Sequence, residues 1–212
     1  MTLYSYLETN YGYNKPIIVS ELKEKDELKN KNLKQLLYTL EKKDKISRYS
    51  QGVYYLPTET IFGKSTLNID EIIYKKYISN GEEIYGFYTG FTFLNSIGLS
   101  EQIVAIPNIV TNNTSSKKRF VFYKKRRTAL LNKSKVTINK DNFKILQFLD
   151  VFRFISDSYI EEIKKGLIKY IKREKLSRKD VEDYIKYFPK STMDKLIRSG
   201  LIYEFTLKKR RI

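Results

Sequence analysis

The side chains best suited to chemistry in this sequence are cations. Of its 212 residues, 41 are Lys or Arg and 24 are Asp or Glu, which gives a formal net charge of +17. Residues 113–141 carry ten basic residues and one acidic residue, so this short stretch holds more than half of the excess. Seven of them form a basic cluster around the aromatic run at 120–123, made up of Lys117, Lys118, Arg119, Lys124, Lys125, Arg126 and Arg127.

A strand with basic ends and aromatic residues between them predicts an anion-binding surface. The phosphate backbone of DNA is the first candidate anion, and an acidic protein face is the second. A simpler alternative is an exposed edge strand that charge protects from aggregation. The Lys excess also follows from an AT-rich genome, so the distribution of charge is more informative than its total.

Other chemistry is excluded by composition. The chain has neither Cys nor His, which rules out disulfides, thiolate nucleophiles, His-dependent zinc sites and His general bases. Acidic residues are almost absent from 113–141, so no carboxylate cluster is expected there to hold a metal ion. We therefore expect no enzyme, no metal and no cofactor.

The first sixty residues predict the elements of a winged helix-turn-helix. Apolar residues at Leu3 to Tyr11 have helical spacing, Ser20 is placed to cap a short second helix, and Asn30 or Asn32 to cap a third. The leucines of this third helix stand at i, i+3, i+4 and i+7, at Leu33, Leu36, Leu37 and Leu40. Two short β-runs then flank the turn at 50–52, which is typical of a hairpin.

In a helix-turn-helix the recognition helix enters the major groove of DNA. Here that would be the third helix, with the hairpin contacting the backbone. The candidate contacts lie on the face of this helix away from the leucines, and they are Lys31, Lys34, Gln35, Tyr38 and Lys42. The candidate hairpin contacts are Arg48, Tyr49 and Gln51. Simple solvated polar residues remain the alternative, because residues 1–60 have a net charge of only +2.

The rest of the chain predicts a mixed α/β domain that ends in a small helical bundle. We expect a boundary between a domain at 1–62 and another at 63–212, with a basic β-ribbon at about 103–127 and helices at about 142–200. Strands are expected at 103–107, 109–112 and 120–123, and an extended segment at 201–207. Overall, the sequence predicts an α+β protein.

Several motifs resemble the AbiEi-type antitoxin family, or a related bacterial branch of unassigned function. They are GVYYLP at 52–57, FG at 62–63, GFYTG at 86–90, LNSIGL at 94–99, the segment 102–107, and VTN at 110–112. The resemblance covers roughly residues 1–130. It implies a type IV antitoxin in which an N-terminal winged helix represses its own operon and a second domain counteracts a nucleotidyltransferase-like toxin.

The expected partners are therefore double-stranded DNA with inverted repeats in the protein's own promoter, and a cognate toxin. The alternative is a protein-interaction module that binds an acidic partner through its basic second domain without reading DNA sequence. No signal peptide or membrane span is apparent, so we expect a cytoplasmic protein without a membrane partner. The sequence does not indicate an oligomeric state.

Overall fold

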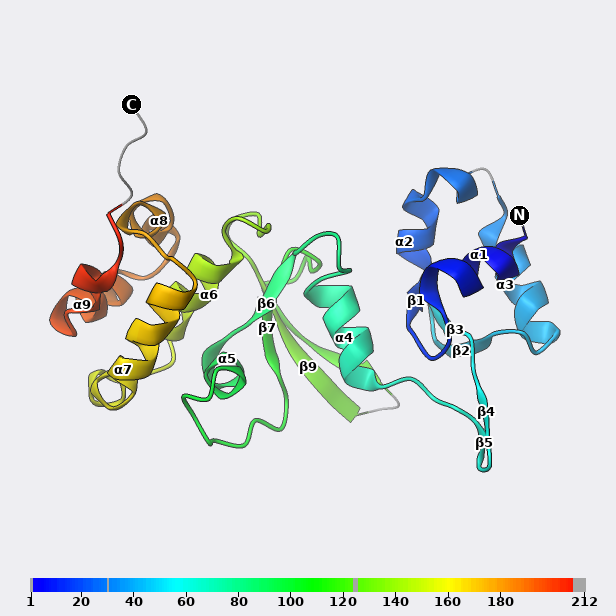
Figure 1. Ribbon diagram of the computed structural model, residues 1–212, viewed down its shortest axis with the longest axis horizontal. Coiled ribbons are helices and arrows are strands. Elements are labelled where there is room, and N and C mark those ends of the chain that lie inside the picture. The colour runs from blue at the N-terminus through cyan, green and yellow to red at the C-terminus, as the bar shows by residue number, and fades with distance from the viewer. Residues whose placement is uncertain (1, 30, 124–125, 208–212) are drawn as a thin grey trace. The chain divides into compact units, whose positions relative to one another are not determined.

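A computed structural model describes residues 2–29, 31–123 and 126–207 of the chain (Figure 1). The protein is of the mixed α/β class, as the sequence predicts. It divides into two compact units, Met1–Lys76 and Tyr77–Ile212, whereas a boundary at 62/63 was expected. Residues 63–76 therefore associate with the first unit.

The first unit contains an apolar core and several helices. They are α1 (Leu3–Tyr11), α2 (Val19–Glu24), the 3-10 turn η1 (Asp26–Leu28), α3 (Leu33–Lys42) and α4 (Ile69–Tyr77), whose last residue belongs to the second unit. Leu7, Leu22 and Leu37 are fully buried in this core. Thr2 caps α1 and Asn32 caps α3, each accepting a hydrogen bond from a backbone N–H three residues on.

Two local predictions in this unit are wrong. Ser20 does not cap α2, because the helix begins one residue earlier and Ile18 stands at its N-cap without a side-chain bond. Leu36 is 36% exposed rather than buried, because it lies at the margin of the apolar stripe that Leu33 and Leu37 form.

The expected hairpin is present and belongs to a three-stranded sheet of order β1-β3-β2. Its strands are β1 (Ile17–Ile18), β2 (Ser47–Ser50) and β3 (Val53–Tyr55), all antiparallel. A second small hairpin follows, β4 (Glu59–Thr60) with β5 (Gly63–Lys64). Its tip residues Ile61 and Phe62 are each 93% exposed.

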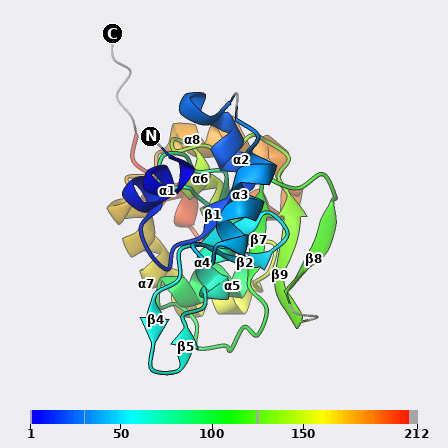
Figure 2. The same cartoon turned by 90° about the vertical axis from the view of Figure 1, so that its right-hand side faces the viewer.

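The second unit contains a four-stranded sheet of order β6-β7-β9-β8. The strands are β6 (Gly86–Tyr88), β7 (Asn108–Thr111), β8 (Lys118–Tyr123) and β9 (Arg126–Lys133). Strands β7 and β9 are parallel and the other pairs antiparallel, and β8 forms one edge of the sheet (Figure 2). Helix α5 (Gly90–Ser96) connects β6 toward β7.

Residues 103–107 form no strand, which corrects the expected start of the ribbon. Ile103 is 92% exposed, and Pro107 lacks the N–H that a strand would use at that position. The ribbon is instead the β8–β9 hairpin, and its second strand continues to Lys133, beyond the expected end at 127.

A helical layer completes the second unit. It comprises α6 (Phe143–Val151), α7 (Asp157–Arg173), α8 (Arg178–Tyr184), η2 (Ile185–Tyr187), α9 (Lys190–Arg198) and η3 (Leu201–Glu204). Phe93 of α5, Phe148 of α6 and Phe152, which follows α6, are fully buried in its core. Ser177 and Asp180 form a capping box at α8. Residues 201–204 form a 3-10 turn, so the extended segment expected at 201–207 is wrong there.

Candidate functional site

One polar surface is formed by α3 of the first unit. Lys34, Gln35, Tyr38 and Lys42 point away from Leu33 and Leu37 and are all exposed, because they occupy the opposite side of an amphipathic helix. The Lys42 ammonium lies 5.7 Å from the centre of the Tyr38 ring. The α3 surface therefore presents two lysine ammonium groups, the amide of Gln35 and the hydroxyl of Tyr38 on one side of the helix.

The residues predicted on and near the hairpin differ in exposure. Arg48 and Gln51 are exposed, and the Arg48 guanidinium lies 6.0 Å from the centre of the Tyr54 ring. Tyr49 is half-buried, and burial raises the pKa of its hydroxyl. Lys31 is exposed just ahead of the α3 cap. Tyr49 thus offers the least surface of the group to a ligand.

In the second unit, the structure separates the basic cluster into two groups. Lys118 begins β8 opposite Asn132, whereas Arg126 stands opposite Tyr123 at the other end of the hairpin. Five residue steps of about 3.3 Å place these two ends roughly 17 Å apart. Lys124 and Lys125 lie outside the described residues. Lys117 and Lys118 therefore do not share a site with Arg126 and Arg127.

Arg119 is engaged within the protein. Its Nε donates a hydrogen bond of 3.1 Å to the Thr114 hydroxyl. Arg119 also makes a side-chain hydrogen bond with Tyr77. Burial raises the pKa of the Tyr77 hydroxyl, and the charge and hydrogen bond of Arg119 act in the opposite direction. Since Arg119 follows Lys118 in a strand, the two side chains point to opposite faces of the sheet.

The turn end of the hairpin carries exposed cations and aromatic rings. Arg126 and Arg127 are exposed, and the Arg127 guanidinium lies 4.5 Å from the centre of the Phe120 ring. Phe120 and Phe122 pack edge to face with ring centres 6.4 Å apart, and Phe122 is 56% exposed. This end of the strand has the basic and aromatic character predicted for an anion-binding surface.

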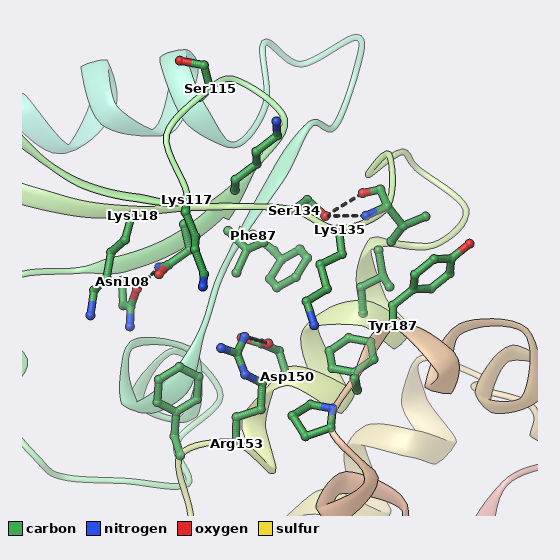
Figure 3. Close-up of a pocket in the computed structure, with 18 residues that line it drawn as sticks. Phe87, Asn108, Ser115, Lys117, Lys118, Ser134, Lys135, Asp150, Arg153 and Tyr187 are labelled. Atoms are coloured by element: carbon green, nitrogen blue, oxygen red, sulfur yellow. Dashed lines mark hydrogen bonds and ion pairs between the residues drawn. The ribbon is translucent and has the colours of Figure 1, made fainter.

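The other end opens into a cavity of about 860 Å³, here called the basic cleft (Figure 3). It lies between the sheet, the loops at the ends of β8 and β9, and the segments that follow α6 and η2. Its polar lining is Asn108, Ser115, Lys117, Lys118, Asn132, Lys133, Ser134, Lys135, Asp150 and Arg153. Its remaining lining is Phe87, Val110, Val136, Leu146, Phe154, Tyr187, Phe188 and Pro189.

A buried carboxylate organises the floor of the cleft. The Asp150 side chain is 3% exposed and accepts a hydrogen bond of 2.7 Å from Nη1 of Arg153. Its other oxygen accepts a bond from the hydroxyl of Thr89, which is fully buried. The Arg153 side chain is 45% exposed, so Asp150 fixes a guanidinium whose remaining N–H groups face the cleft.

Strand pairing and a tight turn place the other polar groups. Val110, Asn132 and Lys118 lie side by side across β7, β9 and β8. The Ser134 hydroxyl donates to the Val136 carbonyl at 2.5 Å, which closes the turn that carries Lys135. Figure 3 shows Lys117, Lys118 and Lys135 extending from the sheet side toward the region of Arg153.

Sequence reasoning did not single out Lys133, Lys135 or Arg153. The first two belong to the basic stretch 113–141, so its charge already pointed toward them. Arg153 gave no such signal, because it is a single cation after an apolar helix and only the fold brings it to the sheet. Among the described residues, no group of three Asp, Glu, His or Cys side chains could hold a metal ion.

The chain belongs to a family of unknown function, DUF6088, whose model matches residues 25–181. The match includes α3, the hairpin of the first unit, the four-stranded sheet and most of the basic cleft. No curated protein matches the chain. None of the helices in the described part of the chain has the length and apolar character to cross a membrane.

Proposed function

We propose that this protein is a winged-helix DNA-binding regulator that represses its own operon. The observation that carries the proposal is the α3 surface, which lies in the element order α1, β1, α2, α3, β2, β3. That order is the one expected of a winged helix, in which the second helix of a helix-turn-helix pair reads base edges in the major groove. Pairing of β1 with β3 supports this interpretation by adding a third strand to the wing sheet.

The side chains on α3 suit base and phosphate contacts. Gln35 can form paired hydrogen bonds with an adenine edge, and Lys34 and Lys42 can bind guanine or phosphate. The Asn32 side chain bonds both the backbone and the side chain of Gln35, which holds this part of the surface in place. Arg48 and Gln51 on the hairpin are proposed as backbone contacts.

Further phosphate contacts are proposed for Arg126 and Arg127, at the exposed turn end of the β8–β9 hairpin. A duplex whose major groove alone is about 12 Å wide does not fit inside the basic cleft. The lysines that line the cleft are exposed, but they surround a concave space that a duplex backbone does not enter.

An antitoxin role is proposed from the resemblance of residues 1–130 to AbiEi-type antitoxins. In that role the second unit would counteract a toxin encoded next to this gene. Co-expression tests it: growth inhibition by the neighbouring gene product should be relieved by this chain. Unrelieved inhibition, with both proteins produced, would contradict the antitoxin role and leave DNA binding to be judged separately.

A protein-interaction module is the second candidate function. It is favoured by Ile61 and Phe62, which place two large apolar side chains at an exposed hairpin tip. The basic faces of the second unit would then meet an acidic partner. Such a module would bind duplex DNA without sequence preference.

A gel-shift experiment separates the two candidates. Full-length protein is titrated at about 150 mM salt against its own promoter fragment and against a shuffled fragment of equal length. The regulator predicts a complex with the promoter at a much lower protein concentration, because specific sites typically bind at least about 1,000-fold more tightly than random DNA. Equal binding to both fragments would contradict sequence-specific repression.

A further inference from the structure

We propose that the basic cleft of the second unit binds a nucleoside polyphosphate. This site is distinct from the DNA-reading surface of the first unit, and the argument for it rests on the residues of the second unit alone. It reassigns Lys117 and Lys118, which the sequence suggested as DNA contacts, to a small-molecule ligand.

The first reason is uncompensated charge. Five basic side chains line the cleft against one acidic side chain, Asp150, and Asp150 is already bonded to Arg153 and Thr89. In the part of the chain that the structure describes, the other four cations form no ion pair; they are Lys117, Lys118, Lys133 and Lys135. A ligand with several negative charges would supply the missing counter-charge, as a polyphosphate does.

The second reason is a fixed anchor among flexible lysines. Arg153 is held by a carboxylate that is itself almost completely buried, so its guanidinium is oriented before any ligand arrives. A planar guanidinium with remaining N–H donors binds two phosphate oxygens at once, whereas each lysine adds a point charge. Lys135 stands on a turn closed by the Ser134 hydroxyl, which restricts where its ammonium can reach.

The third reason is the apolar and aromatic wall. Phe87, Val110 and Leu146 belong to one apolar cluster against which Phe188 packs, and Phe154 and Tyr187 continue the lining. A phosphate chain alone would leave this wall uncovered. A purine or pyrimidine ring can stack on exposed aromatic side chains such as Phe154, which is 38% exposed.

Polar groups for a base or ribose are also present. The Asn132 amide nitrogen donates to the Asn108 side-chain oxygen at 2.5 Å and to the Ile109 carbonyl at 3.2 Å. Among the described residues this leaves the Asn108 amide N–H groups without a partner. They can donate to the ring acceptors or hydroxyl groups of a nucleoside.

The size of the cavity selects the kind of ligand. A volume of about 860 Å³ lies within the range of roughly 300–1,000 Å³ that is typical of small-molecule sites. One nucleotide fits that space, whereas a duplex does not. Single-stranded nucleic acid shares the same phosphate and base chemistry, and the experiment below distinguishes it from a free nucleotide.

Isothermal titration calorimetry on the full chain tests the proposal. The protein is titrated with ATP, GTP, inorganic triphosphate and a short single-stranded oligonucleotide at about 150 mM salt. We expect one site per chain for at least one nucleoside triphosphate, and at least tenfold weaker binding of inorganic triphosphate. Stronger binding of the oligonucleotide, equal binding of inorganic triphosphate, or no nucleotide binding at millimolar concentration would each overturn the proposal.

Variants assign the binding to the cleft. The double variant Lys117→Ala/Lys135→Ala should weaken nucleotide binding at least tenfold, since both side chains are exposed and their removal leaves the core intact. The matched control is Lys165→Ala/Lys169→Ala, which removes two exposed lysines from α7 outside the cleft lining. Equal loss in both variants would mean nonspecific attraction and would contradict a site in the cleft.

Two single variants separate the anchor from the aromatic wall. Arg153→Lys retains a cation for Asp150 but loses the planar fork, and we expect at least fivefold weaker nucleotide binding. Phe154→Ala should weaken nucleotide binding but leave inorganic triphosphate unchanged. None of these variants alters the α3 surface, so promoter binding measured in parallel distinguishes failure of the cleft proposal from failure of the regulator proposal.

Discussion

At the scale of single residues, Asp150 has a buried carboxylate that depends on two partners in the second unit. It carries a carboxylate into the interior, where an unpaired charge is costly, and Thr89 and Arg153 supply its partners. Thr89 lies in the GFYTG motif at 86–90. In the structure, the Thr89 hydroxyl of this motif donates a hydrogen bond to Asp150, which lines the basic cleft.

Replacing Thr89 should expose this dependence. Thr89→Val removes the hydroxyl that donates to Asp150 with little change in shape, and should lower the free energy of unfolding by about 1–3 kcal/mol. Thr89→Ser keeps the hydroxyl and should cost less. Urea denaturation followed by circular dichroism measures both, and equal stability of Thr89→Val and the parent would contradict the proposed role of the hydrogen bond.

Glu174 should make part of the stability dependent on pH. Burial acts to raise the pKa of its carboxyl, but hydrogen bonds and charge from Lys144 and Arg173 outweigh burial and lower the pKa. Because the folded-state pKa is below the unfolded value of about 4.3, this stabilisation is present above that pH and is lost as the pH falls through the folded pKa.

Glu174→Gln should therefore be less stable than the parent at pH 7, and the difference should shrink as the pH is lowered below about 4. Urea unfolding at a series of pH values measures the difference. The same gap at pH 7 and at pH 3 would contradict a depressed pKa at this residue.

At the scale of elements, apolar spacing predicted the helices better than the strands. The stripe through Leu33 and Leu37 and the cap signal at Asn32 are local, and the structure confirms both. Strand β1 was missed because two residues are too few to show an alternating pattern. The apolar run at 103–107 looked like a strand because sequence alone does not reveal whether a pairing partner is available.

The basic cleft could not be predicted from local patterns. Its lining runs from Phe87 to Pro189 and comes from four strands, their loops and two helical segments. Charge in 113–141 indicated an anion site, yet the sheet register sends Lys118 and Arg119 to opposite faces and separates Lys117 from Arg127. These separations depend on pairing between strands, which composition does not encode.

Close packing around Gly86 provides a test of the fold at this scale. A Cβ added to Gly86 would lie 1.9 Å from the Tyr77 carbonyl oxygen, which belongs to the backbone and cannot move away cheaply. Gly86→Ala should therefore lower the free energy of unfolding by about 3 kcal/mol or more. Gly166→Ala is the control, because the atoms nearest to its added Cβ belong to the side chain of Leu99, which can move, and because alanine has the higher helix propensity.

Thermal unfolding followed by circular dichroism measures the pair. We expect a clear loss of stability for Gly86→Ala and a much smaller change for Gly166→Ala. Equal effects would contradict the packing of the Tyr77 carbonyl against β6.

At the scale of the whole molecule, most of the positive charge lies in the second unit, whereas the surface proposed to read DNA sequence lies in the first. Residues 1–60 have a net charge of only +2, yet they hold the surface proposed to read bases. The excess positive charge lies in the second unit, where Arg126 and Arg127 lie at the turn end of the β8–β9 hairpin and Lys117, Lys118, Lys133 and Lys135 line the basic cleft.

This division predicts two different salt dependences. If Arg126 and Arg127 each neutralise a DNA phosphate, Arg126→Gln/Arg127→Gln should reduce the slope of log affinity against log salt by about 2, since each contact contributes about 0.9. Lys117→Gln/Lys118→Gln should leave the slope unchanged, because these residues line the cleft. Fluorescence anisotropy from about 50 to 200 mM salt measures both slopes, and the reverse pattern would contradict the assignment.

The most direct measurement of the central claim is the specificity ratio of the α3 surface. Fluorescence anisotropy at about 150 mM salt compares affinity for the protein's own promoter with affinity for a shuffled duplex, in the parent, in Lys34→Ala/Gln35→Ala and in Lys165→Ala/Lys169→Ala. The regulator proposal predicts a ratio of at least about 1,000 in the parent and the α7 control, and a ratio reduced by tenfold or more in the α3 variant. A ratio near one in the parent, or an unchanged ratio in the α3 variant, would contradict sequence reading by α3.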